Sequence, residues 1–406
     1  MTIDLNKLRR SDDASVRGKR VLVRADLNVP VKGGAVTDTT RIERFVPTVA
    51  GLAGRGARVI VLSHFGRPDG QRKPDMSLKI VADKLSELLG SRTVRFADDC
   101  VGPMAEKAAA GLANGEVLVL ENTRFHAGEE ANDPKFSKAM ARVGEIYVND
   151  AFSCAHRAHS STEGVARLLP AYAGPQMLAE IKALRTALES PRKPVAAIVG
   201  GAKISTKIPV LTNLARQVDM LVIGGGMANT FLAAEGVAIG KSLAEADQTT
   251  VVAQIYAAAQ DGGCEVVLPV DAVVARELKA GAENEVKAIG DIPADGMILD
   301  IGPASVERLK DLVRSCRTVL WNGPLGVFEL APFGEGTFEV AKEVARLTKA
   351  EVLTSVAGGG DTVAALHAAG VADDFTYVST AGGAFLEWLE GRKLPGVAVL
   401  IETGTA

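Results

Sequence analysis

The feature that most constrains the fold is a regular alternation of short apolar runs with longer helical stretches. Ten runs rich in Val, Ile and Leu recur along the chain, at residues 20–25, 57–62, 116–120, 145–149, 195–199, 219–223, 265–270, 318–321, 351–356 and 375–379. Most are apolar at every position, as parallel strands covered by helices on both faces are. We therefore predict an α/β fold with doubly wound, Rossmann-like parallel sheets.

One amphipathic stretch divides this pattern into two lobes of similar size. Its apolar face is formed by four residues at helical spacing: Met177, Ile181, Leu184 and Leu188. Pro175 suits a first helical turn and Pro191 suits a helix end. We predict an interdomain helix over 175–190, between an N-terminal domain, 1–174, and a C-terminal domain, 191–393. The alternative is an ordinary crossover helix within one large sheet.

Size, charge and cysteine spacing exclude several classes of protein. A chain of 406 residues is long enough for two domains, and its net charge of -3 argues against a nucleic-acid binder. It has no run of 18 or more apolar residues and starts with a polar segment, which predicts a cytoplasmic protein without a signal peptide. The cysteines are too widely spaced for a zinc motif, which predicts free thiols: Cys100, Cys154, Cys264 and Cys316.

Cationic side chains follow the strands expected in the first half. The segments are "RADLNVP", "SHFGRP", "ENTRFH" and "NDAFSCAHRAHSS", and "TTRIER" adds Arg41. They carry Arg24, Asp26, Asn28, His64, Arg67, Arg124, His126, His156, Arg157 and His159. Ligands of open α/β sheets bind at the carboxyl ends of strands, and arginine pairs with carboxylate and phosphate oxygens. The pattern predicts a pocket for a small, multiply charged anion. A histidine metal site is the alternative, but no HxH or HExxH spacing supports it.

Glycine-rich segments follow the strands expected in the second half. They are "VGGAKISTK" (199–207), "IGGGMANT" (223–230), "WNGPLGVFE" (321–329), "AGGGDT" (357–362) and "STAGGAF" (379–385). Glycine lets the backbone approach a ligand, and the N–H groups of a helix start then face phosphate oxygens. Lys203 and Lys207 add point charges, and Asp361 suits Mg²⁺ held through phosphates. These features predict a nucleotide phosphate site.

Two familiar nucleotide motifs fail in detail. "GVAIGKS" has only three residues between Gly236 and Gly240, where the P-loop pattern has four. "GGGMAN" has Asn229 where the third glycine of a dinucleotide fingerprint belongs. These departures argue against a P-loop ATPase and a nicotinamide dehydrogenase. The residues alone favour phosphoryl transfer between an anionic substrate and a magnesium nucleotide, which needs positioning and charge neutralisation rather than a nucleophile.

Taken together and in this order, the segments closely resemble those of the phosphoglycerate kinase family. The resemblance covers essentially the whole chain and adds "GGAKISTKI", "GGGMANTF" and "LEGRKLPGVAVL". It implies a phosphotransferase with a carboxyl group as acceptor. The reaction would be reversible transfer of the acyl phosphate of 1,3-bisphosphoglycerate to ADP, giving 3-phosphoglycerate and ATP, in glycolysis or gluconeogenesis. It also implies Mg²⁺, a monomer, hinge closure without a covalent enzyme intermediate, and a tail, 394–406, that returns to the N-terminal domain.

The resemblance also implies roles for individual residues. Substrate-binding residues would be Asp26, Leu27, Asn28, Arg41, His64, Phe65, Gly66, Arg67, Arg124 and Arg157. Nucleotide-binding residues would be Lys207, Gly225, Gly226, Glu329, Gly359, Gly360, Asp361 and Thr362, with Asp361 also serving Mg²⁺ through the nucleotide phosphates. Catalytic residues would be Arg41, Lys203, Gly382 and Gly383.

Four positions depart from the family's commonest pattern. Ser153 and Cys154 stand where Gly-Thr is frequent, Ala381 replaces a glycine, and Ile298 replaces a glycine near the nucleotide. These changes put the fine geometry and the kinetic constants in question, but not the activity. A non-catalytic protein on the same fold would be expected to have lost some of four residues that this chain retains: Arg41, Lys203, Lys207 and Asp361.

Overall fold

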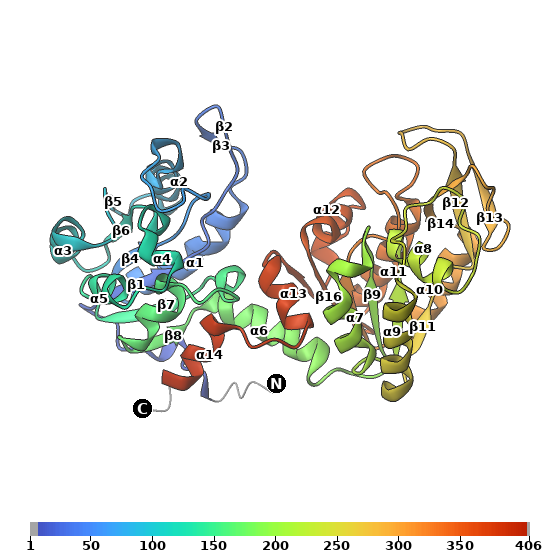
Figure 1. The fold of residues 1–406 in the computed structure, drawn as a ribbon. Coiled ribbons are helices and arrows are strands. Elements are labelled where there is room, and N and C mark those ends of the chain that lie inside the picture. Colours follow the sequence, from blue (N-terminus) through green and yellow to red (C-terminus); the bar gives the residue numbers. More distant parts are fainter. Residues whose placement is uncertain (1–6, 404–406) are drawn as a thin grey trace. The chain divides into compact units, whose positions relative to one another are not determined.

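The computed structural model describes residues 7–403, which form two compact units (Figure 1). Unit 1 contains the chain up to Ile181 and again from Lys393, and unit 2 contains Lys182–Arg392. Each unit has its own six-stranded sheet, so the alternative of one large sheet is wrong. Residues 1–6 of the predicted first domain and 404–406 of the predicted tail lie outside the described residues.

Unit 1 is built on a fully parallel sheet with strand order β5-β6-β4-β1-β7-β8. The strands are β1 (Arg20–Arg24), β4 (Arg58–Leu62), β5 (Val94–Ala97), β6 (Val117–Leu120), β7 (Ile146–Asn149) and β8 (Ala171–Ala173). Val21 and Val23 of β1 pack with α1 (Thr40–Gly54) and α2 (Lys79–Leu89) in one core cluster. Leu22, on the opposite face of β1, is also fully buried. Burial on both faces explains the continuous apolar runs.

Shorter elements complete unit 1. They are the hairpin β2 (Val31–Lys32) and β3 (Ala35–Val36), the helices α3 (Gly102–Ala110), α4 (Ala127–Glu130) and α5 (Pro134–Ala141), and the helical turns η2 (Ser11–Asp13), η3 (Pro74–Met76), η4 (Thr123–Phe125), η5 (Phe152–Cys154), η6 (Ser160–Gly164) and η7 (Val165–Arg167). In α2, Leu85 is fully buried, whereas Leu88 is 38% exposed. Gly90 ends α2 with a positive φ of 63°, a conformation that glycine adopts readily.

Two chain segments connect the units. The first lies in α6 (Pro175–Leu188), whose start is capped by Asp150: Gln176 N and Met177 N donate to Asp150 Oδ1 over 2.7 and 3.2 Å. Met177, Ile181 and Leu184 are fully buried as predicted, whereas Leu188 is only partly buried. The second connection precedes α14 (Pro395–Glu402), which contacts β8 and η5 of unit 1. The C-terminal segment thus returns to unit 1.

The main sheet of unit 2 has the strand order of a Rossmann sheet, β11-β10-β9-β15-β16-β17, with all strands parallel. The strands are β9 (Val195–Val199), β10 (Met220–Ile223), β11 (Glu265–Val267), β15 (Thr318–Asn322), β16 (Thr354–Gly358) and β17 (Tyr377–Ser379). The chain winds outward from β9 to β11 and then crosses back to β15. The order therefore reverses between β9 and β15, where ligands of such sheets bind.

Helices and a second, smaller sheet surround this framework. The helices are α7 (Ile208–Ala215), α8 (Gly225–Ala234), α9 (Thr249–Gly262), α10 (Pro303–Ser315), α11 (Glu335–Lys349), α12 (Gly360–Ala368) and α13 (Gly383–Leu389), with the turns η8 (Ile204–Thr206) and η9 (Ala372–Asp374). The small antiparallel sheet has the order β13-β12-β14, formed by β12 (Asp271–Ala275), β13 (Asn284–Ala288) and β14 (Met297–Ile301). Within residues 7–403, no helix is both long enough and apolar enough to span a membrane.

Candidate active sites

The polar segments of unit 1 follow four neighbouring strands of its sheet. Asp26 and Asn28 follow β1, and His64 follows β4. Arg124 follows β6, and Ser153 follows β7. The strands are parallel, so their carboxyl ends lie along one edge of the sheet, and the hydrogen bonds described below link the loops there.

Arg41 and Asp26 form the most direct link between predicted site residues. Arg41 Nη1 donates to Asp26 Oδ2 over 2.8 Å and to the carbonyl oxygen of Asn28 over 3.0 Å. Ser153 Oγ donates to the same Asp26 oxygen over 2.6 Å. Ser153, one of the unusual residues, thus ties the loop after β7 to the loop after β1. Asp26 holds both a cation and a hydroxyl at this edge.

A second chain of hydrogen bonds links Asn28, Gly66 and Arg124. Gly66 N donates to Asn28 Oδ1 over 2.9 Å, and Arg124 Nη1 donates to the Gly66 carbonyl over 2.9 Å. The Nε of Arg124 also lies 2.9 Å from Glu130 Oε1. Arg124 is buried, and that burial lowers the pKa of its guanidinium. Three loops are therefore joined through the residues that the sequence marks as anion ligands.

The predicted substrate residues differ in what they can offer a ligand. Leu27 and Phe65 are buried in the hydrophobic core of unit 1, so their side chains pack against other core residues. Arg67 is exposed and makes no hydrogen bond or ion pair within the described residues. Arg157 is half-buried, and its Nε donates to Nε2 of the neighbouring His156 over 3.1 Å. Arg67 thus presents its guanidinium to solvent at the sheet edge that carries His64.

Sequence reasoning left Arg24 out of the residues assigned a role. It is the last residue of β1, is 2% exposed, and its Nη2 lies 3.0 Å from His64 Nδ1. The sequence shows Arg24 only as an arginine at the end of an apolar run, and such an arginine can equally be a surface residue at the end of a strand. Asp26, His64 and Cys154 also lie close enough together to hold a metal ion. However, the buried guanidinium beside them disfavours a cation there.

In unit 2, the loops meet at the point where the strand order reverses. Gly200 N donates to the carbonyl oxygen of Asn322 over 3.0 Å, joining the loops after β9 and β15. A Cβ on Gly200 would lie 1.8 Å from the Pro324 carbonyl oxygen, and Gly323 has a φ of +108°. Any side chain at these glycines would push the two loops apart. Glycine is thus required for the loops to close on each other.

Lys207 lies inside this junction rather than extending from it. Its Nζ donates to the Gly200 carbonyl over 2.7 Å and to the side-chain and backbone oxygens of Asn322 over 2.7 and 3.2 Å. Burial lowers the pKa of its ammonium to about 8, although Asp361 opposes the shift. Lys203 differs, because its side chain is exposed. The two lysines are therefore held in contrasting environments.

A cavity of about 470 Å³ opens beside this junction. It is lined by Gly225, Gly226, Glu329 and Asp361 of the predicted nucleotide site, by apolar residues that include Leu243, Met297 and Ile298, and by Asp300. Burial raises the pKa of the Asp300 carboxyl to about 7. The cavity is large enough for a nucleotide base and sugar. Ile298, unusual by its sequence, adds an apolar branched side chain to the lining.

The starts of two helices complete the predicted phosphate and catalytic segments. Gly359 precedes α12 with a φ of +100°, and Thr362 Oγ1 accepts a hydrogen bond of 2.6 Å from Gly323 N. Asp361 is exposed in the first turn of α12, so its carboxylate is accessible to a ligand. Gly382 and Gly383 stand at the start of α13.

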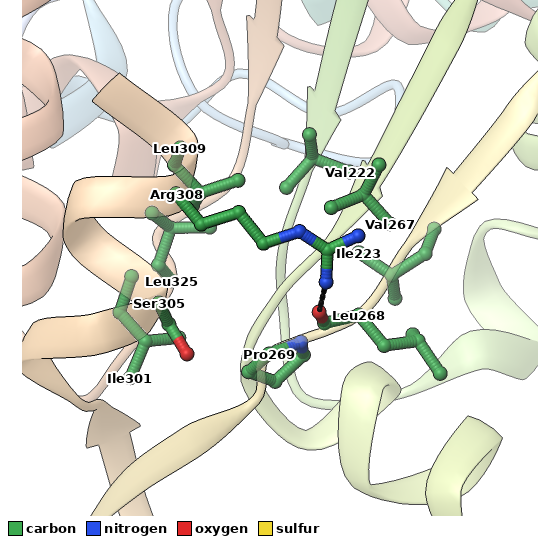
Figure 2. A pocket seen from close by; sticks show the side chains of 10 residues that line it. All are labelled: Val222, Ile223, Val267, Leu268, Pro269, Ile301, Ser305, Arg308, Leu309 and Leu325. Carbon is green, nitrogen blue, oxygen red and sulfur yellow. Dashed lines mark hydrogen bonds between the residues drawn. The ribbon is translucent and has the colours of Figure 1, made fainter. Parts of the chain in front are cut away.

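A separate pocket in unit 2 does not qualify as a site. It lies between β10, β11 and α10, and Figure 2 shows mostly apolar side chains around Arg308, which donates to the Leu268 carbonyl over 3.5 Å. Its volume of about 10 Å³ holds no more than a water molecule.

One unit therefore carries arginines on hydrogen-bonded loops at the carboxyl ends of its parallel strands. The other has glycine loops and a large cavity at the point where its strand order reverses. This combination defines a two-domain α/β phosphotransferase. The phosphoglycerate kinase family model matches residues 11–392. The phosphoglycerate kinases of Rhizobium meliloti (strain 1021) and Methylorubrum extorquens (strain PA1) are 62% and 60% identical to this chain. They align over 96% and 98% of it, and over 97% and 100% of their own lengths.

Solved structures agree. Phosphoglycerate kinase from Coxiella burnetii has a TM-score of 0.90 at 41% identity, over 97% of this chain and 99% of its own. The structure from Pyrococcus horikoshii OT3 has a TM-score of 0.80 at 31% identity, over 98% and 99%. The chain belongs to the phosphoglycerate kinase family. The predicted family, fold class and enzyme class are confirmed, and the dehydrogenase and non-catalytic alternatives are set aside.

Proposed function

We propose that the enzyme transfers the acyl phosphate of 1,3-bisphosphoglycerate to ADP, giving 3-phosphoglycerate and ATP, and that it catalyses the reverse reaction. The observation that carries this proposal is the division of ligand chemistry between the units. Unit 1 gathers arginines and polar side chains at one sheet edge, and unit 2 offers glycine loops and a cavity. A place in glycolysis or gluconeogenesis follows from this reaction.

In unit 1, we assign the phosphorylated acid to the sheet edge bearing Arg41, His64, Arg67, Arg124 and Arg157. Guanidinium groups match carboxylate and phosphate oxygens, which are the charged ends of this substrate. Asp26 and Asn28 would hold the glycerate part, with backbone groups of Leu27, Phe65 and Gly66 nearby. Arg41 would also neutralise charge on the phosphoryl group as it moves.

In unit 2, we assign the nucleotide to the cavity and to the loops beside it. Gly225, Gly226 and Glu329 would contact its base and sugar. The start of α12, with Gly359, Gly360, Asp361 and Thr362, would face its phosphates. Lys207 would reach the same phosphates. When bound, Mg²⁺ would neutralise phosphate charge, with Asp361 as its protein contact. Lys203 and the glycines that start α13, Gly382 and Gly383, would stabilise the transferred group.

Closure of the two units completes the proposal. Direct transfer requires donor and acceptor oxygens to meet, whereas the two sets of ligands belong to different units. We propose that both substrates together favour a closed arrangement of the units, with the chain bending near the ends of α6 and before α14. Closure would also exclude water, which otherwise hydrolyses an acyl phosphate. The cytoplasmic location and the monomeric state stay predictions.

An assay of the purified chain tests the reaction. ATP, Mg²⁺ and 3-phosphoglycerate are supplied, and production of 1,3-bisphosphoglycerate is coupled to NADH oxidation by glyceraldehyde-3-phosphate dehydrogenase. We expect turnover that depends on all three components. A protein that binds both ligands but gives no turnover would contradict the proposal.

A further inference from the structure

The buried guanidinium of Arg24 has a defined set of partners in unit 1. Its Nε donates to Ser161 Oγ over 2.8 Å, and its Nη1 donates to the Ala25 carbonyl. Its Nη2 lies 3.0 Å from His64 Nδ1 and 3.6 Å from Cys154 Sγ. Every nitrogen of the guanidinium is therefore engaged, and one contact falls on a histidine assigned to the substrate.

The contact with His64 determines where the imidazole carries its proton. Arginine has only N–H donors and stays protonated in proteins. The facing Nδ1 must therefore accept, so it bears no hydrogen. A neutral imidazole with a bare Nδ1 has its hydrogen on Nε2, whereas an imidazolium has one on each nitrogen. We propose that Arg24 is a positioning residue that fixes His64 as the neutral Nε2–H tautomer, which presents a hydrogen-bond donor to an anionic oxygen of the substrate.

The surroundings of His64 support the same protonation state. The ring is 6% exposed, and its burial lowers the pKa well below its ordinary value. The cations Arg24, Arg124, Arg157 and Arg41 lower it further. Burial also raises the pKa of the Cys154 thiol, 4.0 Å from Nδ1, so no thiolate faces that nitrogen to favour an imidazolium.

A buried carboxylate keeps Arg24 in place. Ser161 N donates to Glu129 Oε2 over 2.9 Å, and Ser161 Oγ donates to Oε1. Thr123 Oγ1 donates to Glu129 Oε1 over 3.3 Å, and Glu129 is completely buried. The result is a buried relay, Glu129–Ser161–Arg24–His64. Burying a guanidinium without a counter-charge would cost free energy at this depth. The Glu129 carboxylate, which Arg24 reaches through Ser161, supplies that counter-charge.

Nitrogen NMR of the full chain with ¹⁵N-labelled histidine tests the inference directly. The His64 signals are identified by their absence in His64→Asn, and long-range ¹H–¹⁵N couplings report the tautomer. At neutral pH without ligands, we expect a bare Nδ1 and a protonated Nε2. An Nδ1–H tautomer or an imidazolium would overturn the inference. This reading uses the wild-type protein and does not depend on whether a variant folds.

Variants at position 24 test whether Arg24 is the cause. In Arg24→Gln, the amide can present either an oxygen or an N–H group, so we expect mixed tautomers at His64. Affinity for 3-phosphoglycerate should fall about tenfold, while that for ADP is unchanged. Arg24→Lys keeps a donor-only group and should restore the single tautomer. The control is Arg55→Gln, which removes an arginine bound to the carbonyls of Ser11 and Ala14 and should leave His64 unaltered.

The inference rests on the proposed function, but the two can fail separately. If the wild-type protein has the expected tautomer but does not bind 3-phosphoglycerate, the proposed function is overturned, and with it the substrate role that the inference gives to His64. If it binds 3-phosphoglycerate and a folded Arg24→Gln keeps the single Nε2–H tautomer, only the role of Arg24 is overturned.

Discussion

The two candidate sites both lie at the carboxyl ends of parallel strands but offer a ligand different groups. In unit 1, the candidate ligands are side chains held by other side chains, as Arg41 is by Asp26. In unit 2, backbone groups dominate, and glycine lets the loops after β9 and β15 touch. The difference supports the proposed assignment of a particular small anion to unit 1 and of phosphates attached to a larger group to unit 2.

The largest effect should come from the exposed lysine of unit 2. Lys203→Ala should lower kcat about 100- to 1,000-fold with little change in either KM, because a donor to the transferring group acts mainly in the transition state. Steady-state kinetics in both substrates provide the measurement. Lys342→Ala, on α11, is the matched control. A rise in nucleotide KM with unchanged kcat would instead make Lys203 a ground-state ligand and weaken the contrast with Lys207.

The second largest effect is expected from the arginines of unit 1, which should act on one substrate only. Arg67→Ala and Arg157→Ala should each weaken binding of 3-phosphoglycerate by roughly 1.5–3 kcal/mol, because each removes a charge-assisted hydrogen bond. ADP affinity should be unchanged. Calorimetry with each ligand decides this, and Arg95→Ala serves as control, because Arg95 lies on the outermost strand β5 and pairs with Glu116. Equal losses for both ligands would break the proposed division between the units.

A third prediction uses the environment of Lys207. With a pKa of about 8, Lys207 is uncharged in roughly half of the protein molecules at pH 8. Bound phosphates favour the charged ammonium and raise its pKa, so ADP binding should take up about half a proton at that pH. Calorimetry in buffers of different ionisation enthalpy measures the uptake. Lys207→Arg, which stays charged, should abolish it. The same uptake in that variant would place the titrating group elsewhere.

The smallest expected effect is a change in size. The radius of gyration from small-angle X-ray scattering should fall by a few per cent when 3-phosphoglycerate and a magnesium nucleotide are both present. Either ligand alone should change it less, since each contacts only its own unit and has little differential affinity for a closed state. A ligand-free protein as compact as the ternary complex would contradict closure.

Much of the fold could be predicted, because all ten apolar runs became strands of the two parallel sheets. The missed strands lack that signature. β5 is an edge strand in which Arg95 is exposed, and β8 has only three residues. In the small sheet, β13 reads "NEVKA" and is largely exposed, so it resembles a loop in sequence. Edge and surface strands bury too little apolar area to leave a continuous run.

The same limit applies to the sites. Arginines that follow strands could be recognised, because both the residue type and its position directly after an apolar run are visible in the sequence. The partners that hold them could not. Ser161 lies 137 residues from Arg24, and Asn322 lies 115 residues from Lys207. Sequence spacing carries no information about such pairs, so the buried relay and the engaged state of Lys207 emerge only in three dimensions.

The return of the chain to unit 1 delays the completion of that unit during synthesis. Gly396 N donates to the Ala155 carbonyl over 2.8 Å, Asn149 Nδ2 donates to the Gly396 carbonyl over 3.3 Å, and Val399 is fully buried. Unit 2 is continuous in sequence and is translated in full before α14 appears. At about 5–20 residues per second, the ribosome needs on the order of ten seconds or more to make it. Throughout that interval, the nascent unit 1 lacks the helix that contacts its loop after β7, so the half made first is the half finished last.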